Sequence, residues 1–227
     1  MRIYDHLLQF SLFQGLSRSE LLQMAGNTKF GFLKLPAGKT IVSDGDLCTQ
    51  LFFLISGSLK LSTSSDDHGY SVTEQLSAPW LLQPESLFGL SPRYSCTAIV
   101  VSGDSQSPAE AHFITLSKDE VLRLTDDFLI IRLNYLNLMA TLTQRRTRQA
   151  WHRSPTDLRQ RIARFLTDHC TYPAGRKTIH ILMERLAQEV NDNRLHVSQT
   201  LKAMQADGLL TLHRGRIEVP SLERLFM

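Results

Sequence analysis

The sequence predicts a mixed α+β protein with an N-terminal β-sandwich or β-barrel, a long helix and a C-terminal helix-turn-helix. Three observations indicate this fold class. Turn signals recur about every 8 to 12 residues between apolar, β-type runs in the first half. The hydrophobic period becomes helical after Ser117, and two short helical patterns flank an Asn-Asp-Asn turn near the end. The 227 residues are enough for one large domain or two small ones.

The composition is ordinary for a folded protein. Apolar residues make up 42% of the chain and charged residues 21%, which excludes disorder and collagen-like repeats. Charge interrupts every apolar stretch well short of the roughly 20 residues that span a membrane, and the N-terminus lacks the apolar core of a signal peptide. Cys48, Cys96 and Cys170 lie far apart, which argues against a disulfide framework. We therefore expect a cytoplasmic protein without membrane contact.

The first part of the chain begins with short helices, the second of which starts at a capping box formed by Ser17 and Glu20. From about Phe30, short strands alternate with turns, and further strands are expected at Ser95–Val101 and Ala111–Leu116. The turns are Pro36-Ala37-Gly38, Asp44-Gly45-Asp46, Ser56-Gly57-Ser58 and Asp66-Asp67-His68-Gly69. This spacing is typical of a small β-sandwich or β-barrel.

A single long helix is predicted over residues 117–152, because no strong turn signal occurs before Ser154-Pro155. One line of side chains recurs along it at alternating spacings of four and three: Leu129, Leu133, Leu136, Ala140 and Thr143. A second apolar line comprises Ile131, Leu138 and Leu142. A helix with two such faces can pack on its own domain and on a partner helix. The pattern favours a parallel homodimer with the first line as its seam, the alternative being burial of both faces within one chain.

The C-terminal part starts with another helix. Ser154 is its expected N-cap, with Pro155 in the first turn and Asp157 three residues after the cap. Its buried stripe comprises Leu158, Ile162, Phe165 and Leu166, and it ends at Tyr172-Pro173-Ala174-Gly175. A short strand at Thr178–Ile181, two helices and a hairpin at Leu210–Val219 complete the chain.

Charge is distributed unevenly along the chain. Residues 1–152 contain 13 Lys and Arg against 14 Asp and Glu, whereas residues 153–227 contain 12 against 8, so the net charges are −1 and +4. Arginine is concentrated between positions 145 and 164, with Asp157 as the one acid there: Arg145, Arg146, Arg148, Arg153, Arg159, Arg161 and Arg164. A basic C-terminal part indicates an anionic partner. The alternative is a solvated basic surface.

Residues 183–208 have the pattern of a helix-turn-helix. A first helix ends at Val190, before the turn Asn191-Asp192-Asn193. Asn191 tolerates a left-handed backbone, and Asn193 suits the N-cap of the next helix, residues 194–206. Two helices joined by such a turn can present the second helix to the DNA major groove.

A helical projection of residues 194–206 separates an apolar side from a polar one. Val197, Thr200, Leu201 and Met204 fall on the side that faces a core. The opposite side and the hairpin supply the candidate DNA-binding residues: Asn193, Arg194, Leu195, Ser198, Gln199, Lys202, His213, Arg214 and Arg216. Arg suits guanine, Gln suits adenine and Leu can contact a thymine methyl, while hairpin arginines suit phosphates. The sequence therefore predicts binding of double-stranded DNA, the alternative being an ordinary solvated face.

Two regions of the chain carry recognisable motifs. Residues 186–201 read Leu-Ala-Gln-Glu-Val-Asn-Asp-Asn-Arg-Leu-His-Val-Ser-Gln-Thr-Leu and are followed by Asp207-Gly208-Leu209-Leu210. Upstream, Leu35–Lys39, Asp44-Gly45-Asp46 and Leu54–Lys60 carry characteristic turn glycines and strands. With these motifs the chain resembles the Crp/Fnr family of bacterial transcription regulators over nearly its whole length.

The resemblance implies three parts. They are a cyclic-nucleotide-binding-like β-roll of the jelly-roll type (a double-stranded β-helix) over residues 1–116, a dimerisation helix over residues 117–152 and a Crp-type winged helix-turn-helix over residues 153–227. It also implies a transcription regulator that binds near-palindromic operators as a homodimer, with RNA polymerase as a candidate partner. An effector in the roll would act by shifting the long helix and re-aiming the DNA-binding domains. Bases would be read by Arg194, Leu195 and Gln199; because Leu195 replaces an acid found in many relatives, the operator sequence does not carry over.

The effector site departs from that of relatives that bind cyclic AMP, which carry Phe-Gly-Glu and then Arg-Ser/Thr-Ala. Glu85 matches the ribose-binding acid, but Ser95 or Cys96 stands where the Arg would bind phosphate, and Arg93 is offset. A buried phosphate without a bidentate cation would be poorly compensated. We therefore expect any small-molecule effector to be something other than cyclic AMP, in a pocket formed by Glu85, Ser86, Ser95, Cys96 and Thr97.

Other chemistry has less support in the sequence. An iron–sulfur cluster needs closely spaced cysteines, whereas Cys48 stands alone. Haem ligation by His6, His68 or His112 with a partner such as Cys48, and a redox role for Cys96, stay open as alternatives. The sequence has no GxSxG, P-loop or HExxH motif, so we expect no enzymatic activity and no metal site. The rival class is a ligand- or haem-sensing binding module that acts mainly through protein contacts.

Overall fold

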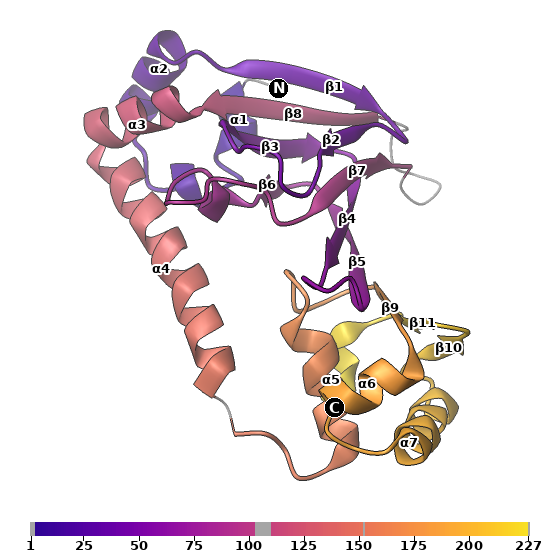
Figure 1. Cartoon of the computed structure of the whole chain (residues 1–227). Helices are drawn as coiled ribbons and strands as arrows, with labels where there is room; N and C mark the ends of the chain where they lie inside the picture. Colours follow the sequence, from indigo (N-terminus) through magenta and orange to yellow (C-terminus); the bar gives the residue numbers. More distant parts are fainter. Residues whose placement is uncertain (1–2, 103–109, 152, 227) are drawn as a thin grey trace. The chain divides into compact units, whose positions relative to one another are not determined.

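The computed structural model describes residues 3–102, 110–151 and 153–226 of the chain. It separates into two compact units: the first comprises residues 1–59 and 76–150, and the second comprises residues 60–75 and 151–227. Figure 1 labels the helices and strands of both. No helix in the described ranges combines the length and the apolar character needed to cross a lipid bilayer.

The first unit begins with α1 (Ile3–Leu7), the 3-10 turn η1 (Ser11–Phe13) and α2 (Arg18–Asn27). The predicted capping box is confirmed at the start of α2. Ser17 Oγ accepts from the Glu20 backbone N–H at 3.3 Å, and a Glu20 carboxylate oxygen accepts from the Ser17 N–H at 2.7 Å. These two bonds satisfy donors that a helix leaves open at its start.

The core of the first unit is an antiparallel sheet in the order β1-β8-β3-β6. Its strands are β1 (Gly31–Pro36), β8 (Glu110–Ser117), β3 (Gln50–Ser56) and β6 (Trp80–Leu82). Phe53 of β3 lies opposite Ile114 of β8 and is completely buried. The rings of Phe10 and Phe13 pack against Phe53, with centroids 5.0 and 5.5 Å away. A second pair, β2 (Thr40–Val42) with β7 (Thr97–Val101), adds to the β-rich part that the turn spacing predicts.

The helix predicted over residues 117–152 is interrupted. α3 (Lys118–Asp127) ends at Phe128, which is buried and has an extended backbone (φ −124°, ψ 106°), and α4 (Leu129–Trp151) follows. Arg132 donates from Nε to the Thr125 carbonyl at 2.7 Å and from Nη2 to the Asp126 carbonyl at 3.2 Å. These bonds satisfy acceptors that α3 leaves open at its end. No Gly or Pro marks this break in the sequence.

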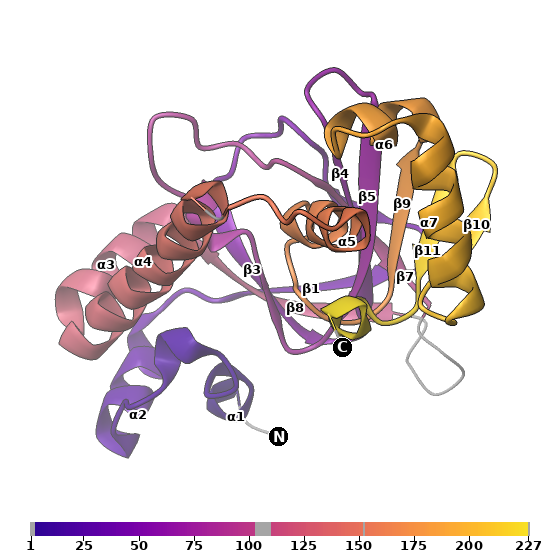
Figure 2. The same ribbon diagram turned by 90° about the horizontal axis from the view of Figure 1, so that it is seen from below.

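The second unit contains a winged helix-turn-helix. Its elements are α5 (Leu158–Asp168), β9 (Lys177–Ile181), α6 (Met183–Glu189), α7 (Arg194–Ala206), β10 (Thr211–His213), β11 (Arg216–Val219) and the 3-10 turn η3 (Leu222–Phe226). Ile162 of α5, Leu186 of α6 and Leu201 of α7 are completely buried in one core. Figure 2 shows α7 beside the hairpin β10–β11, which we call the wing.

Helix α5 begins later than the sequence suggests. Its N-cap is Asp157, whose carboxylate accepts from the Gln160 backbone N–H at 3.0 Å, so the assignment of Ser154 as the cap is wrong. Pro155 disfavours a helical conformation at Ser154. A start at Leu158 still places the predicted stripe in the core, with Ile162, Phe165 and Leu166 all buried.

A hairpin from the middle of the chain extends the sheet of the second unit. β4 (Ser58–Ser64) and β5 (Tyr70–Ser77) form this hairpin, and β5 pairs antiparallel with β9, with Glu74 opposite Lys177. The strand order in this part is β10-β11-β9-β5-β4 (Figure 2). In packing terms, residues 60–75 therefore belong with the C-terminal elements rather than with the rest of residues 1–116.

Glu74 and Lys177 form a buried ion pair in this sheet. Their side chains are 2% and 0% exposed, and Lys177 Nζ lies 2.9 Å from Glu74 Oε1. The Glu74 oxygens also accept the backbone N–H groups of Thr171 at 2.7 Å and Tyr172 at 3.0 Å. Because both oxygens have donors, the cost of burying this carboxylate is compensated.

Candidate nucleic-acid interface

The turn before α7 fixes where that helix begins. Asn191 has a left-handed backbone (φ 50°), as the sequence predicts, and this lets the chain turn sharply after α6. Asn193 is the N-cap, since its Oδ1 accepts from the His196 backbone N–H at 2.9 Å. Between them, Asp192 accepts from the Asn193 N–H at 2.8 Å. Local hydrogen bonds therefore define the first residue of α7 as Arg194.

The two sides of α7 differ as the helical projection predicts. Val197, Leu201 and Met204 are completely buried, and Thr200 is half-buried. Among the candidate DNA-binding residues of this segment, Ser198 is half-buried and the others are exposed: Asn193, Arg194, Leu195, Gln199 and Lys202. Leu195 is 65% exposed. The helix thus presents a mixed basic, amide and apolar surface of the kind that reads base edges.

The wing residues have unequal surroundings. Arg214 is exposed at the turn between β10 and β11, next to Gly215, whose positive φ of 69° suits a tight turn. Arg216 Nη2 lies 3.1 Å from Glu218, and His213 Nε2 lies 3.6 Å from the same carboxylate. Glu218 therefore offsets part of the positive charge that the sequence places in the wing, and Arg214 is its most available cation.

The start of α7 and the wing line one small cavity. Arg194 of α7 and His213 and Arg214 of the wing line one cavity of about 270 Å³. The other lining residues are mostly apolar and come from β9, α6 and the hairpin: Ile181, Leu182, Met183, Leu186, Leu212, Gly215 and Ile217. Residues that the sequence separates by some twenty positions therefore form one local surface, with guanidinium groups from two elements.

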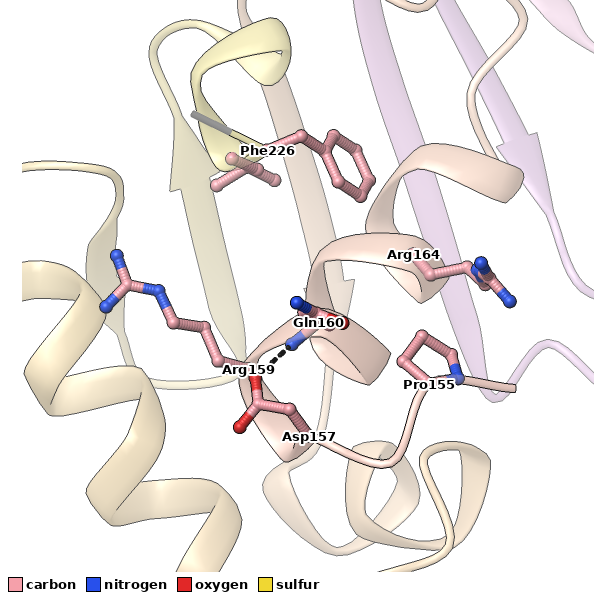
Figure 3. Close-up of a pocket in the computed structure, with 7 residues that line it drawn as sticks. Pro155, Asp157, Arg159, Gln160, Arg164 and Phe226 are labelled. Atoms are coloured by element: carbon pink, nitrogen blue, oxygen red, sulfur yellow. Dashed lines mark hydrogen bonds between the residues drawn. The ribbon is translucent and has the colours of Figure 1, made fainter. Parts of the chain in front are cut away.

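Two of the three arginines of α5 contact acids, so the helix does not present one open basic surface. Arg159 Nη1 lies 2.6 Å from Asp207 Oδ2, and Arg161 Nη2 lies 2.5 Å from Asp192 Oδ2. Arg164 donates to the Arg153 carbonyl. Figure 3 shows Arg159 and Arg164 extending in opposite directions beside a cavity of about 470 Å³ at the start of α5. The arginine-rich stretch is thus partly neutralised within the chain.

The Asp192 carboxylate contacts three neighbouring groups, in Asn193, His196 and Arg161. The Asn193 N–H bond, with further help from His196 and Arg161, holds the pKa of Asp192 below its ordinary range. The carboxylate is therefore ionised at neutral pH beside α7, where it pairs with the Arg161 cation.

Beside the candidate effector residues lies one that the sequence does not single out. Gln83 is buried and has a left-handed backbone (φ 35°). Its amide Nε2 donates to Ser95 Oγ at 2.8 Å, and its Oε1 accepts from the Ser95 N–H at 3.0 Å. A neutral amide therefore contacts Ser95, one of the two residues that the family resemblance places at the position of the phosphate-binding arginine. A glutamine before a proline looks like ordinary turn sequence, so no local signal identifies Gln83.

The other candidate effector residues lie in varied surroundings. Glu85 is exposed in the 3-10 turn η2 (Pro84–Ser86), where Ser86 is buried. Cys96 is completely buried, and Thr97 Oγ1 accepts from the Asp44 N–H at 3.2 Å. The offset cation Arg93 donates to the Gly45 carbonyl at 2.6 Å, so it is held at the turn around Gly45.

Helix α4 has one covered side and one uncovered side. The five predicted seam residues are all exposed: Leu129, Leu133, Leu136, Ala140 and Thr143. On the covered side, Ile131 and Tyr135 are buried, while Leu138 and Leu142 are half-buried. Tyr135, which sequence reasoning missed, donates to the Pro84 carbonyl at 3.0 Å, and burial raises its pKa to about 12. The helix is therefore tied to η2 of the candidate pocket.

Two family models match the chain, and together they cover elements of both units. The model of the Crp-like helix-turn-helix domain matches residues 160–226, and the model of the cyclic nucleotide-binding domain matches residues 32–126. The chain belongs to the Crp/Fnr family. The resemblance seen in the sequence motifs is therefore confirmed.

Solved structures share this Crp/Fnr fold. The catabolite activator protein of Thermus thermophilus is 23% identical, with a TM-score of 0.54, over 96% of this chain and 97% of that one. A putative Crp/Fnr regulator from Eubacterium rectale is 20% identical, with a TM-score of 0.51, over 96% of each chain. At these identities the likeness establishes the fold alone. No curated protein sequence shows significant similarity to the chain.

Three of the remaining candidates, Cys48, His68 and His112, have ordinary surroundings. Burial raises the pKa of the Cys48 thiol, whose Sγ donates to the Gln50 carbonyl at 3.7 Å. His112 Nε2 lies 3.4 Å from Glu110, and His68 sits in the turn of the β4–β5 hairpin with a positive φ of 53°. Within the described ranges, no three His, Cys, Asp or Glu side chains gather as a metal-binding group. A thiol held protonated by burial is a poor metal ligand and a poor nucleophile.

Proposed function

We propose that this Crp/Fnr chain is a sequence-specific DNA-binding transcription regulator and has no enzymatic activity. The observation that carries this proposal is the surface formed by the exposed side of α7 and the wing, where Arg194 and Arg214 line one cavity. A buried core behind α7 fixes the orientation of that surface. The net charge of +4 over residues 153–227 supports an anionic partner.

The residues divide by the part of DNA that each suits. Arg194 and Gln199 carry the donors and acceptors for guanine and adenine edges, and Leu195 suits a thymine methyl. Lys202, Ser198 and Asn193 lie on the same helix segment, at positions suited to phosphates or to bases at the edge of the site. Arg214 suits a phosphate, with His213 and Arg216 in supporting positions because Glu218 engages them.

We propose that two copies pair through the uncovered side of α4. Leu129, Leu133 and Leu136 are 62%, 49% and 57% exposed, a large apolar area for a helix to leave in water. A symmetric pair would present two α7 helices to successive major grooves, about 34 Å apart on a near-palindromic operator. The cytoplasm, where DNA and RNA polymerase are available, is the proposed place of action.

We propose that any effector of the roll is a small molecule other than cyclic AMP. The supporting observation is that Ser95 contacts the neutral Gln83 amide, while Arg93 is held by the Gly45 carbonyl. An effector in this pocket has a direct route to α4, because the Pro84 carbonyl accepts from Tyr135. A ligand of this kind acts only through its different affinity for two conformations of the chain.

Selection of the purified full-length protein on a random duplex pool, without added ligand, tests the proposed function. We expect enrichment of a two-fold-symmetric site with half-sites about one helical turn apart. The matched control is the Arg194→Ala/Gln199→Ala double variant, whose substitutions lie on the exposed side of α7. If folded, dimeric wild-type protein enriches no site, with or without candidate ligands, DNA reading is excluded. The rival, a sensing module that acts through protein contacts, then becomes the better interpretation.

A further inference from the structure

Helix α7 is held at both ends by arginines of α5. At its start, Arg161 pairs with Asp192 of the turn, and at its end, Arg159 pairs with Asp207. Neither arginine belongs to the candidate DNA-binding surface. Sequence reasoning places both among the basic residues that face an anionic partner, whereas the structure pairs each with an acid of its own chain.

In the first pair, a single carboxylate connects Arg161 to the start of α7. Asp192 Oδ2 contacts Arg161, while Asp192 Oδ1 accepts from the Asn193 N–H at 2.8 Å and lies 3.2 Å from His196 Nδ1. Asn193 in turn caps α7. Arg161 is thus two hydrogen bonds away from the residue immediately before Arg194. The side chains of this pair are only 21% and 19% exposed, which limits screening by water.

The second pair neutralises an acid in an unfavourable position. Asp207 is the C-cap of α7, where the helix dipole places partial negative charge and an acidic side chain is disfavoured. Arg159 supplies the compensating cation at 2.6 Å, although the two side chains are 43% and 50% exposed. We therefore expect this pair to contribute less than the one at Asp192.

The spacing of the two arginines on α5 explains how one helix reaches both ends of another. At about 100° per residue, Arg159 and Arg161 lie about 200° apart around α5. The buried stripe that packs toward α7 lies between them: Ile162, Phe165 and Leu166. Each arginine therefore emerges on its own flank of the helix contact. Two ionic contacts on opposite flanks of the apolar contact add to the resistance that the core packing offers to rotation of α7.

We propose that Arg161, acting through Asp192, and Arg159, acting through Asp207, are positioning residues for base recognition. They fix the angle at which α7 presents Arg194 and Gln199. This inference rests on the proposed DNA-binding function. Base contacts require a tightly held geometry, whereas a phosphate contact tolerates small displacements of a point charge. Loss of either ion pair therefore lowers discrimination between operator and unrelated DNA more than it lowers binding to DNA in general.

The test compares the dissociation constants of the full-length protein for its selected operator and for a scrambled duplex at one salt concentration. We expect Arg161→Met to lower the ratio of the scrambled-duplex constant to the operator constant about tenfold. Arg159→Met should lower this ratio less. Arg161→Lys should restore most of the ratio. The matched control is Arg224→Met, which removes one exposed arginine of the same unit and should leave the ratio unchanged. Thermal melting of each variant confirms that it is folded.

The acid partner separates positioning from direct contact with DNA. Asp192→Asn keeps an oxygen for the Asn193 N–H but removes the charge that holds Arg161. Positioning predicts a loss of discrimination similar to that of Arg161→Met, and a double variant that is no worse than either single one. If Arg161 instead binds phosphate, Asp192→Asn strengthens binding to both duplexes and preserves their ratio, and our proposal is overturned. A wild-type protein that does not discriminate would instead count against the proposed function.

Discussion

Arg194 and Arg214 line the same cavity but should act on different parts of DNA. Arg194 opens α7, so Arg194→Ala or Gln199→Ala should lose discrimination at particular base pairs, by about 1–3 kcal/mol each. Titrations on operators with single substitutions measure this loss. An equal loss at every position of the operator would show that these residues do not read bases.

Arg214 is the matched contrast to those two residues. It is exposed at the wing turn and suits a phosphate. Arg214→Ala should weaken binding to all duplexes alike and reduce the slope of log affinity against log salt by about one. Binding measured across a range of salt concentrations checks this. If affinity at low salt does not change, the wing does not contact DNA.

Glu74 and Lys177 carry a different prediction, because both side chains are almost completely buried. Glu74→Ala leaves the Lys177 ammonium and two backbone N–H groups without their acceptor, and should lower the free energy of unfolding by about 3–5 kcal/mol. Urea unfolding measures the loss. The control is Asp67→Ala, which breaks the exposed Asp67–Arg185 pair and should have a much smaller effect. Similar losses in the two variants would mean that burial does not decide the strength of these pairs.

Among the elements, α4 provides the clearest test of assembly. Leu133→Asp places a charge at the centre of the exposed apolar line and should convert a dimer into a folded monomer, because the charge would be buried in the seam. Sedimentation or light scattering measures the mass. Thr141→Asp is the control, since Thr141 is exposed about 120° from the centre of that line. A Leu133→Asp protein that stays dimeric would place the seam elsewhere.

The 3-10 turn η3 introduces a pH dependence. Hydrogen bonds from Ser221 and from the Gly175 backbone lower the pKa of Glu223 from its ordinary 4.5 to about 2. The folded state therefore favours the ionised form. Its contribution to stability is complete above pH 4.5 and is lost as the pH falls toward 2. Glu223→Gln should unfold with a weaker pH dependence in that range than wild type. Equal acid sensitivity in the two proteins would contradict this assignment.

The sequence-based predictions are accurate where the interactions join residues close in sequence, and they fail where the partners are distant. The capping box at Ser17, the left-handed Asn191 and the cap at Asn193 all depend on residues within a few positions, and all are confirmed. The break at Phe128 depends on the side chain of Arg132 reaching back to the carbonyls of Thr125 and Asp126, so hydrophobic periodicity does not reveal it.

The candidate sites follow the same rule. The exposed residues of α7 follow from helical period alone, whereas the engagement of Arg216 by Glu218 and of Ser95 by Gln83 depends on where other segments fold. The pairing of β5 with β9 is the most distant case, because 103 residues separate Glu74 from Lys177. A pattern read along one segment has no information about such a partner.

At the scale of the whole molecule, the chain passes between the two units three times: near residue 59, near residue 76 and after α4. The hairpin β4–β5 therefore belongs by sequence to the matched cyclic nucleotide-binding region and by packing to the helix-turn-helix unit. Because β5 pairs with β9, a displacement of the β4–β5 hairpin also displaces β9, without involving the connection through α4.

This interleaving bears on how new regulators can be assembled from this protein. A chimera cut only after α4 would place a foreign β9 opposite the native β5. The incoming residue at position 177 would then have to carry a positive charge and fit beside Glu74. Transplanting residues 60–75 together with the C-terminal segment keeps that pair intact. For exchange of DNA specificity, the transferable module is therefore two pieces of sequence rather than one.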